Sequence, residues 1–198
     1  MMIQSPYLWL SPKAQKITFI IFFILTIILL GCLQIIDTSL QTEEAPMGIV
    51  SFQLAGDLSN SLDIIESWND AGEETNQFYA GLSLGIDYLF MLAYAISIGL
   101  GCILLTKTLI RKKHVLSSSF LPSLSNTLAW GAIIAALLDV IGNYILIRLL
   151  LGSTSEMLPV ISFWFATFKF LILGIALLYI LITLIMIIIP VKDKAPIS

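Results

Sequence analysis

Three ionisable residues, Asp87, Asp139 and Lys169, lie inside long apolar runs of the chain. Ionisable side chains are costly within a membrane, so by default they suggest a functional site. We measure the depth of each residue from the end of its run that we expect to face the outside of the cell. At 1.5 Å per helical residue, Asp87, Asp139 and Lys169 lie about 7, 12 and 13 Å from that end, respectively. We therefore expect the three side chains to share one level in the outer half of the bilayer.

Two polar residues extend this candidate cluster. Asn143 follows Asp139 by four residues, so the two share a helix face, and Tyr94 lies two turns below Asp87. The cluster could be a structural ion-pair network that fixes the register of the helices. It could equally line an outward-facing pocket that binds a polar head group or moves a proton. The candidate ligand-binding residues are Asp87, Tyr94, Asp139, Asn143 and Lys169.

Two enzymatic interpretations of the same region are weaker. Paired aspartates occur in aspartyl proteases, where two carboxylates share a proton, but Lys169 at the same depth favours charge compensation. The stretch from Gly81 to Gly85 matches the nucleophile-elbow pattern, which requires a strand–turn–helix and a nearby base. The sole histidine, His114, lies beyond the opposite end of that span. We expect Gly81 and Gly85 to pack against a helix instead, and we assign no catalytic residue.

Metal and cofactor chemistry is not indicated. Cys32 and Cys102 lie on different runs without a Cys-x-x-Cys pair, and a single histidine leaves no recognisable zinc-type site. The residues Leu29 to Cys32 resemble a lipobox, although a retained helix is the favoured interpretation. A basic cluster could bind lipid head groups or could simply set the topology. Its residues are Arg111, Lys112 and Lys113.

The composition identifies the class of protein. Of the 198 residues, 58% are hydrophobic and only 12% are charged, and the mean hydropathy is +0.98. Soluble domains contain about a quarter charged residues. The chain therefore lacks the polar surface of a cytosolic enzyme or a nucleic-acid-binding module, and it reads as an integral membrane protein.

Four apolar runs can form membrane spans, at about 17–36, 82–106, 124–147 and 160–189. A span needs about 20 apolar residues, and lipid offers no partners for backbone groups, so each run must be helical. We predict an all-α membrane protein with one domain, a four-helix transmembrane bundle. A short amphipathic helix is expected in its first extracytoplasmic loop.

The distribution of charge predicts the orientation. Eight of the ten basic residues flank one set of span ends, whereas the loop 37–80 has none. The positive-inside rule then places both termini and the loop 107–123 in the cytoplasm.

The outer loop 37–80 carries nine acidic residues. Alternation over Val50–Leu54 predicts a short extended segment. Helical spacing from Leu58 to Trp68 predicts an amphipathic helix that lies on the membrane or caps the bundle. Trp68, Phe78 and Tyr79 suit an interfacial belt. The acidic loop could attract a partner, or it could merely reflect the avoidance of basic residues in translocated loops.

Three stretches, Gly48–Trp68, Gly85–Ala95 and Leu138–Leu150, together resemble small four-span bacterial membrane proteins without an assigned activity. The resemblance covers about a quarter of the chain and implies a plasma-membrane location. It also implies an Asp-x-x-Glu-Asn pattern in the third span. This chain has Gly142 in place of the glutamate, which weakens any acid–base role.

The leading hypothesis is a non-enzymatic protein that binds a lipid or amphiphile in the polar pocket. The alternative is an accessory subunit of a membrane complex that uses the loop 37–80 for contact. A membrane-embedded enzyme or a proton-coupled carrier comes third. Carriers usually show internal repeats, whereas the four spans of this chain are not repeated. Membrane lipids are the expected partners, with no nucleic acid and no cofactor.

Overall fold

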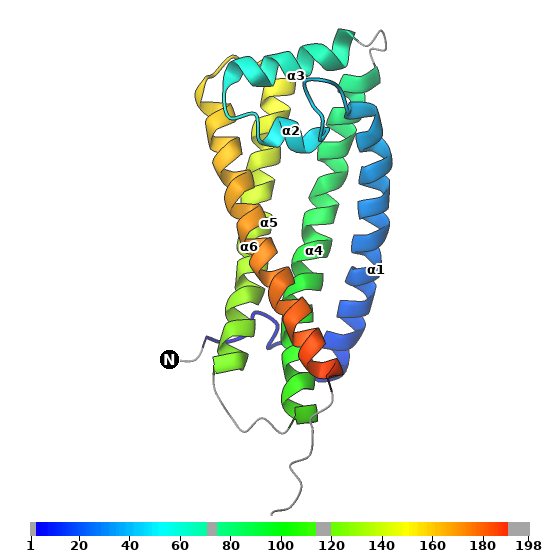
Figure 1. The fold of residues 1–198 in the computed structure, drawn as a ribbon, viewed down its shortest axis with the longest axis vertical. Helices are drawn as coiled ribbons and strands as arrows, with labels where there is room; N and C mark the ends of the chain where they lie inside the picture. Colours follow the sequence, from blue (N-terminus) through cyan, green and yellow to red (C-terminus); the bar gives the residue numbers. More distant parts are fainter. Residues whose placement is uncertain (1–2, 71–74, 114–119, 190–198) are drawn as a thin grey trace, which may run out of the picture.

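A computed structural model describes residues 3–70, 75–113 and 120–189, and these residues form helices and loops without a strand. Four helices are long and apolar enough to cross a bilayer (Figure 1). They are α1 (Pro12–Asp37), α4 (Thr75–Lys113), α5 (Phe120–Leu150) and α6 (Met157–Ile188). The predicted fold class, a four-helix transmembrane bundle, is confirmed.

The four long helices do not pack as a closed ring. Helix α4 packs along α1 and α5, and α5 packs along α6, whereas α4 and α6 make a smaller contact. No comparable packing joins α1 to α6 within the described residues. The bundle is therefore less tightly closed on the side between α1 and α6.

The helices extend beyond the apolar runs that predicted them. Helix α4 continues to Lys113 and α5 begins at Phe120, so most of the predicted loop 107–123 is helical. Pro122 and Pro159 lie in the first turns of α5 and α6, where the missing backbone N–H of proline is tolerated. Hydropathy located the spans, but polar residues outside the hydrocarbon can still continue a helix.

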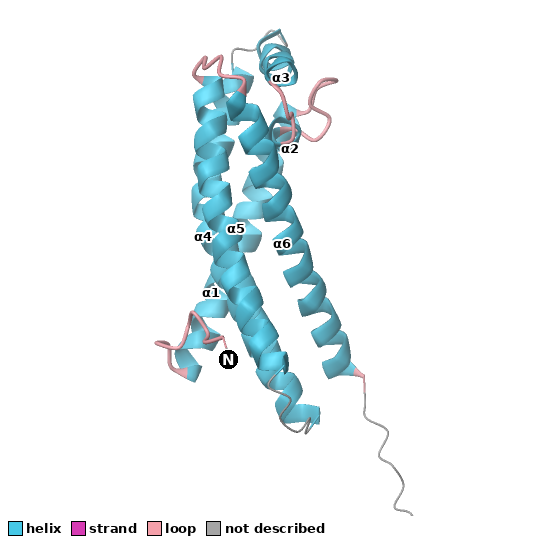
Figure 2. Cartoon of the chain, turned by 90° about the vertical axis from the view of Figure 1, so that its left-hand side faces the viewer, coloured by secondary structure: helices cyan, strands magenta, loops and turns pink. Residues whose placement is uncertain are grey.

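The predicted amphipathic helix is α3 (Leu58–Asp70), and it lies across one end of the bundle (Figure 1, Figure 2). Its buried side chains include Ser61, Ile64 and Trp68, whereas Leu62 is exposed. The assignment of Trp68 to an interfacial belt is wrong. Its side chain is fully buried, and its indole N–H donates to the carbonyl oxygen of Leu40 at 2.8 Å.

The extended segment predicted over Val50–Leu54 is also wrong, because Ile49–Gln53 forms a short helix, α2. Consecutive side chains, Phe52 and Gln53, are both buried, which alternation does not allow. An extended segment would need a partner strand for its backbone groups, and the described part of the chain offers none. A helical turn satisfies some of those groups internally.

Asp37 and Gly48 hold α2 in place. The Asp37 carboxylate oxygen Oδ1 accepts a hydrogen bond from the backbone N–H of Ile49 at 2.7 Å. Gly48 has a φ of +53°, and a Cβ atom there would collide with the Asp37 carboxylate. Only glycine both adopts this conformation readily and leaves room for the carboxylate. The last residue of α1 thereby fixes where α2 begins.

The glycines expected to pack against a helix do not. Gly81 and Gly85 are exposed on α4, and a Cβ atom at either would meet none of the described residues within 4 Å. Close approach occurs instead at Gly131 on α5, where a Cβ atom would lie 3.2 Å from Cγ2 of Ile172 on α6. Small residues allow this contact, which brings α5 and α6 together below the polar residues.

Candidate functional site

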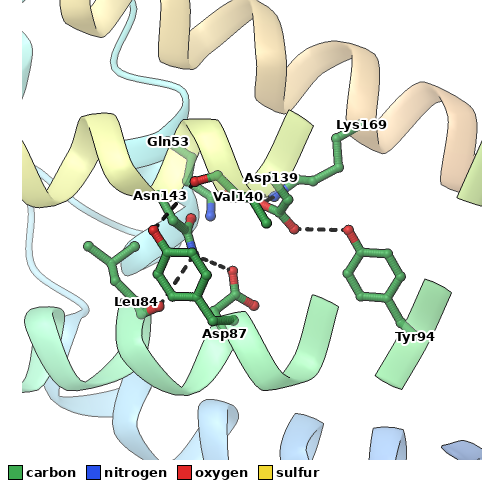
Figure 3. A network of polar contacts seen from close by, with 9 residues as sticks. Gln53, Leu84, Asp87, Tyr94, Asp139, Val140, Asn143 and Lys169 are labelled. Carbon is green, nitrogen blue, oxygen red and sulfur yellow. Dashed lines mark hydrogen bonds and ion pairs between the residues drawn. The ribbon is translucent and has the colours of Figure 1, made fainter. Parts of the chain in front are cut away.

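An ion pair buried between α5 and α6 forms the centre of the candidate site (Figure 3). Lys169 Nζ lies 2.6 Å from Asp139 Oδ1, and the two side chains are only 6% and 5% exposed. Charges so far from water require a partner with good geometry. This pair satisfies that requirement and ties the two helices together.

Lys169 is further engaged by two neighbours. Its ammonium group donates to the side-chain oxygen of Gln53 at 3.1 Å, so α2 reaches down to the bundle interior. The same group lies 4.5 Å from the centre of the Phe170 ring, a distance at which cations are attracted to aromatic faces. Three groups therefore contact the Lys169 ammonium group: the Asp139 carboxylate, the Gln53 side-chain oxygen and the Phe170 ring.

Asp139 uses its second oxygen as well. The Tyr94 hydroxyl donates to Asp139 Oδ2 at 3.0 Å, and the Tyr94 side chain is buried on α4. Four elements, α2, α4, α5 and α6, thus converge on one carboxylate–ammonium pair. Such convergence fixes how the helices are rotated relative to one another.

A second polar contact lies on the cap side of this pair. Asn143, one turn along α5 from Asp139, donates from Nδ2 to Asp87 Oδ2 at 2.7 Å and to the Leu84 carbonyl oxygen at 3.4 Å. Asp87 makes no ion pair with any described residue. Of the two candidate aspartates, only Asp139 is neutralised by a lysine.

A cavity of about 450 Å³ lies between α1 and α6, with α4 as its inner wall and α2 at its end. Ser83 and Ile98 both line it, which gives it a length of about 22 Å along α4 at 1.5 Å per residue. It is therefore longer than half of a hydrocarbon core of about 30 Å. The polar network lies in its wall through Gln53, Asp87, Tyr94, Asp139 and Lys169.

The cavity is polar towards the cap and mostly apolar towards the opposite end. Asp37, Gln53 and Ser83 line it near the cap, and Asp87 and Lys169 follow. Farther down, its walls are mainly apolar, with Phe23, Ile27, Ile98, Leu173 and Leu177. At the far end, Phe19 and Ile180 both come close to Gly101, where the helices approach one another. The shape matches a molecule with one polar end and one apolar chain.

Two buried polar atoms beside the network lack hydrogen-bond partners among the described residues: Asn143 Oδ1 and Ser162 Oγ. Both residues line a second cavity of about 10 Å³, together with Gln53, Asp139 and Lys169. A space of this size accommodates about one water molecule.

No protein-family model, curated protein or solved structure matches this chain. The resemblance to small four-span bacterial membrane proteins therefore stays a prediction. The site has to be interpreted from its own contacts, charges and shape.

The structure brings all five candidate residues into one region: Asp87, Tyr94, Asp139, Asn143 and Lys169. Their role in binding stays a prediction. The basic candidates are remote from this site. Arg111 and Lys112 are exposed near the far end of α4, and the side chain of Lys113 lies outside the described part of the structure.

Sequence reasoning missed Gln53. It lies in a segment that alternation assigned to an extended conformation, and a glutamine in a polar loop gives no signal of its own. Lys169, which contacts Gln53 in the structure, gave an indirect signal. A buried ammonium group needs more acceptors than a single carboxylate provides, so a further polar side chain was to be expected nearby.

Proposed function

We propose that this protein binds a lipid or another single amphiphile in the cavity between α1 and α6. The observation that carries the proposal is the placement of the buried polar network in the wall of a long, otherwise largely apolar cavity. Ligand cavities of about 300–1,000 Å³ with a few convergent polar groups are typical of small-molecule sites. The polar head would lie near Asp87, and the chain would extend towards Leu177.

Entry from the bilayer is consistent with the packing. Helices α1 and α6 are not held together along their length within the described residues. Cavity-lining side chains on both helices, such as Leu30 and Leu177, are about half exposed. A lipid chain could therefore pass between α1 and α6 without leaving the hydrocarbon, which removes the penalty of crossing water.

We also propose that the capped end faces the outside of the plasma membrane and that both termini are cytoplasmic. The support is the charge distribution, with the acidic cap at one end of the bundle and Lys13, Lys16, Arg111 and Lys112 near the other. A fluorescent protein fused to the C-terminus should fluoresce, and alkaline phosphatase fused after Asp70 should be active. The reverse pattern would contradict this orientation.

Narrowing the cavity should displace the amphiphile. Leu177 and Leu178 are neighbours on α6 with exposed fractions of 52% and 56%, but only Leu177 lines the cavity. We expect Leu177→Trp to reduce the occupancy of bound amphiphile by about tenfold or more, because the indole would fill space that the chain needs. Native mass spectrometry of protein purified in a mild non-ionic detergent measures this occupancy.

Leu178→Trp is the matched control, since it adds the same side chain to the lipid-facing side of the same helix. It should retain wild-type occupancy. Equal loss in both variants, or no bound amphiphile in the wild type under any lipid supplement, would contradict the proposed function. A stoichiometric protein partner in place of a lipid would favour the role of an accessory subunit.

A further inference from the structure

The charges around the cavity are not balanced. Among the described residues, three carboxylates line it, those of Asp37, Asp87 and Asp139, whereas Lys169 is the one cation in this lining. Lys169 is already engaged by Asp139, Gln53 and the ring of Phe170. An anionic head group would find no available cation in the wall and would meet at least one carboxylate at low dielectric, where like charges repel strongly.

Of these three carboxylates, Asp87 is the one that can accept a further polar contact. It accepts one hydrogen bond, from Asn143, and has no cationic partner among the described residues. By contrast, Asp139 is neutralised by Lys169, and Asp37 at the rim caps the first turn of α2. A carboxylate inside a membrane is expected to be paired. A positively charged ligand could supply the missing partner.

Aromatic rings lie on the same face of α4 as this carboxylate. Phe90 and Tyr94 follow Asp87 by three and seven residues, both line the cavity, and their ring centres are 5.3 Å apart. Cations are attracted to aromatic faces, most strongly where water is excluded. A carboxylate with two rings on its own helix face is an arrangement that an ammonium group favours.

We infer that the ligand is a single-chain amphiphile with a positively charged ammonium head, which binds Asp87 while its chain occupies the apolar end of the cavity. This inference rests on the proposed function, because it requires the cavity to be the binding site. The juxtaposition that carries it is a carboxylate without an ion-pair partner among the described residues, two aromatic rings on the same helix face and an apolar channel, all within one cavity.

The test compares three probes that share one chain and differ in the head: hexadecylammonium, hexadecanol and palmitate. Each is titrated into the protein in non-ionic detergent, and native mass spectrometry gives its dissociation constant. We expect hexadecylammonium to bind at least about tenfold more tightly than hexadecanol, and palmitate to bind most weakly, because a desolvated charge-assisted contact discriminates by roughly this factor or more.

Variants assign the preference to one carboxylate. Asp87→Asn should bring the ratio of hexadecylammonium to hexadecanol affinity close to one, whereas Asp87→Glu, which keeps the charge, should retain the preference. Glu66→Gln removes an exposed charge from α3 and should leave the ratio unchanged, which excludes a general electrostatic effect. An unchanged ratio in Asp87→Asn, or tighter binding of palmitate in the wild type, would overturn the inference.

The outcomes separate this inference from the proposal beneath it. If the wild type binds the three probes equally and Leu177→Trp binds none, the cavity is the site but the ammonium assignment is wrong. If the wild type binds no probe, the proposed function fails as well. An amine-bearing lipid that remains bound through purification would identify the membrane as the source. Protein that is purified empty but binds added hexadecylammonium would indicate an amphiphile from outside.

Discussion

Replacing Lys169 by methionine is expected to destabilise the protein by about 3 to 5 kcal/mol, the usual effect of removing one partner from a buried ion pair. The substitution keeps much of the side-chain volume but leaves the Asp139 carboxylate, only 5% exposed, without its cation. It also removes the donor to Gln53. Thermal unfolding in detergent, and steric trapping for the free energy, would measure the loss.

The double variant Lys169→Met/Asp139→Asn tests the cause of that loss. The asparagine oxygen can still accept from the Tyr94 hydroxyl, which lies 3.0 Å from Asp139 Oδ2, and neither charge of the ion pair remains. Replacing both members of a buried pair is often nearly neutral, so most of the stability should return. Lys16→Met, at an exposed position, should change stability little. If Lys169→Met alone is as stable as the wild type, the stabilising role of the Lys169–Asp139 ion pair is contradicted.

The double-mutant cycle also distinguishes a structural role for the pair from a role in binding. If the pair only fixes helix packing, the double variant should regain amphiphile occupancy along with stability. If Lys169 or Asp139 contacts the head group, stability should return without occupancy. Coupling energies of about 0.5 to 3 kcal/mol are common for residues in contact, and this buried pair should lie at the upper end.

The bundle was predictable from sequence because hydropathy and helix geometry act over long segments. Each apolar run was long enough to span a bilayer, and the fixed rise of a helix converted residue numbers into depth. That arithmetic placed Asp87, Asp139 and Lys169 at a common level, and the structure brings them together. Depth is a property of each helix alone, so it needs no knowledge of the partners.

The pairing of the site residues was not predictable, because it depends on how each helix is rotated about its axis. Runs that are apolar on every side carry little information about rotation. Sequence alone therefore left open whether Lys169 would pair with Asp87 or with Asp139. The choice depends on close contacts such as that of Gly131 with Ile172, which set how α5 faces α6.

The cap was predicted least well, because its short elements are held by tertiary contacts. Five alternating residues suggested an extended segment, yet the Asp37 carboxylate and the conformation of Gly48 favour a helical turn at α2. Tertiary context often overrides local propensity over such lengths. Gln53 reaches the site only because α2 is helical. The wrong prediction of an extended segment therefore also left Gln53 out of the predicted site.

Trp68 is the residue on which the cap most depends, and Trp68→Ala should have the second large effect. The side chain is fully buried, its N–H donates to Leu40, and its ring meets that of Phe52 edge-on with centres 5.4 Å apart. Loss of a buried tryptophan destabilises by about 3 to 5 kcal/mol. Because α3 lies across the end of the bundle, the loss should fall on the cap rather than on the spans.

Hydrogen exchange measured by mass spectrometry can localise this effect. In Trp68→Ala, backbone amides of α2 and α3 should exchange faster, whereas those of α5 should remain protected, since local unfolding is confined to the weakened unit. Trp68→Phe keeps the apolar ring but leaves the Leu40 carbonyl oxygen without its donor, so a smaller loss of about 1 to 3 kcal/mol is expected. Trp164→Ala, at a 51% exposed position on α6, is the matched control and should leave cap exchange unchanged.

The consequence for binding follows from the position of Phe52 next to Gln53. When Trp68 no longer supports Phe52, the turn at α2 should loosen, and the Gln53 oxygen should leave the Lys169 ammonium group, now 3.1 Å away. The cap end of the cavity would then admit water, which weakens electrostatic contacts to a head group. Trp68→Ala should therefore lower the occupancy of bound amphiphile, although the cavity walls on α1 and α6 are intact. If occupancy is unchanged while the cap is loosened, α2 is not needed for binding.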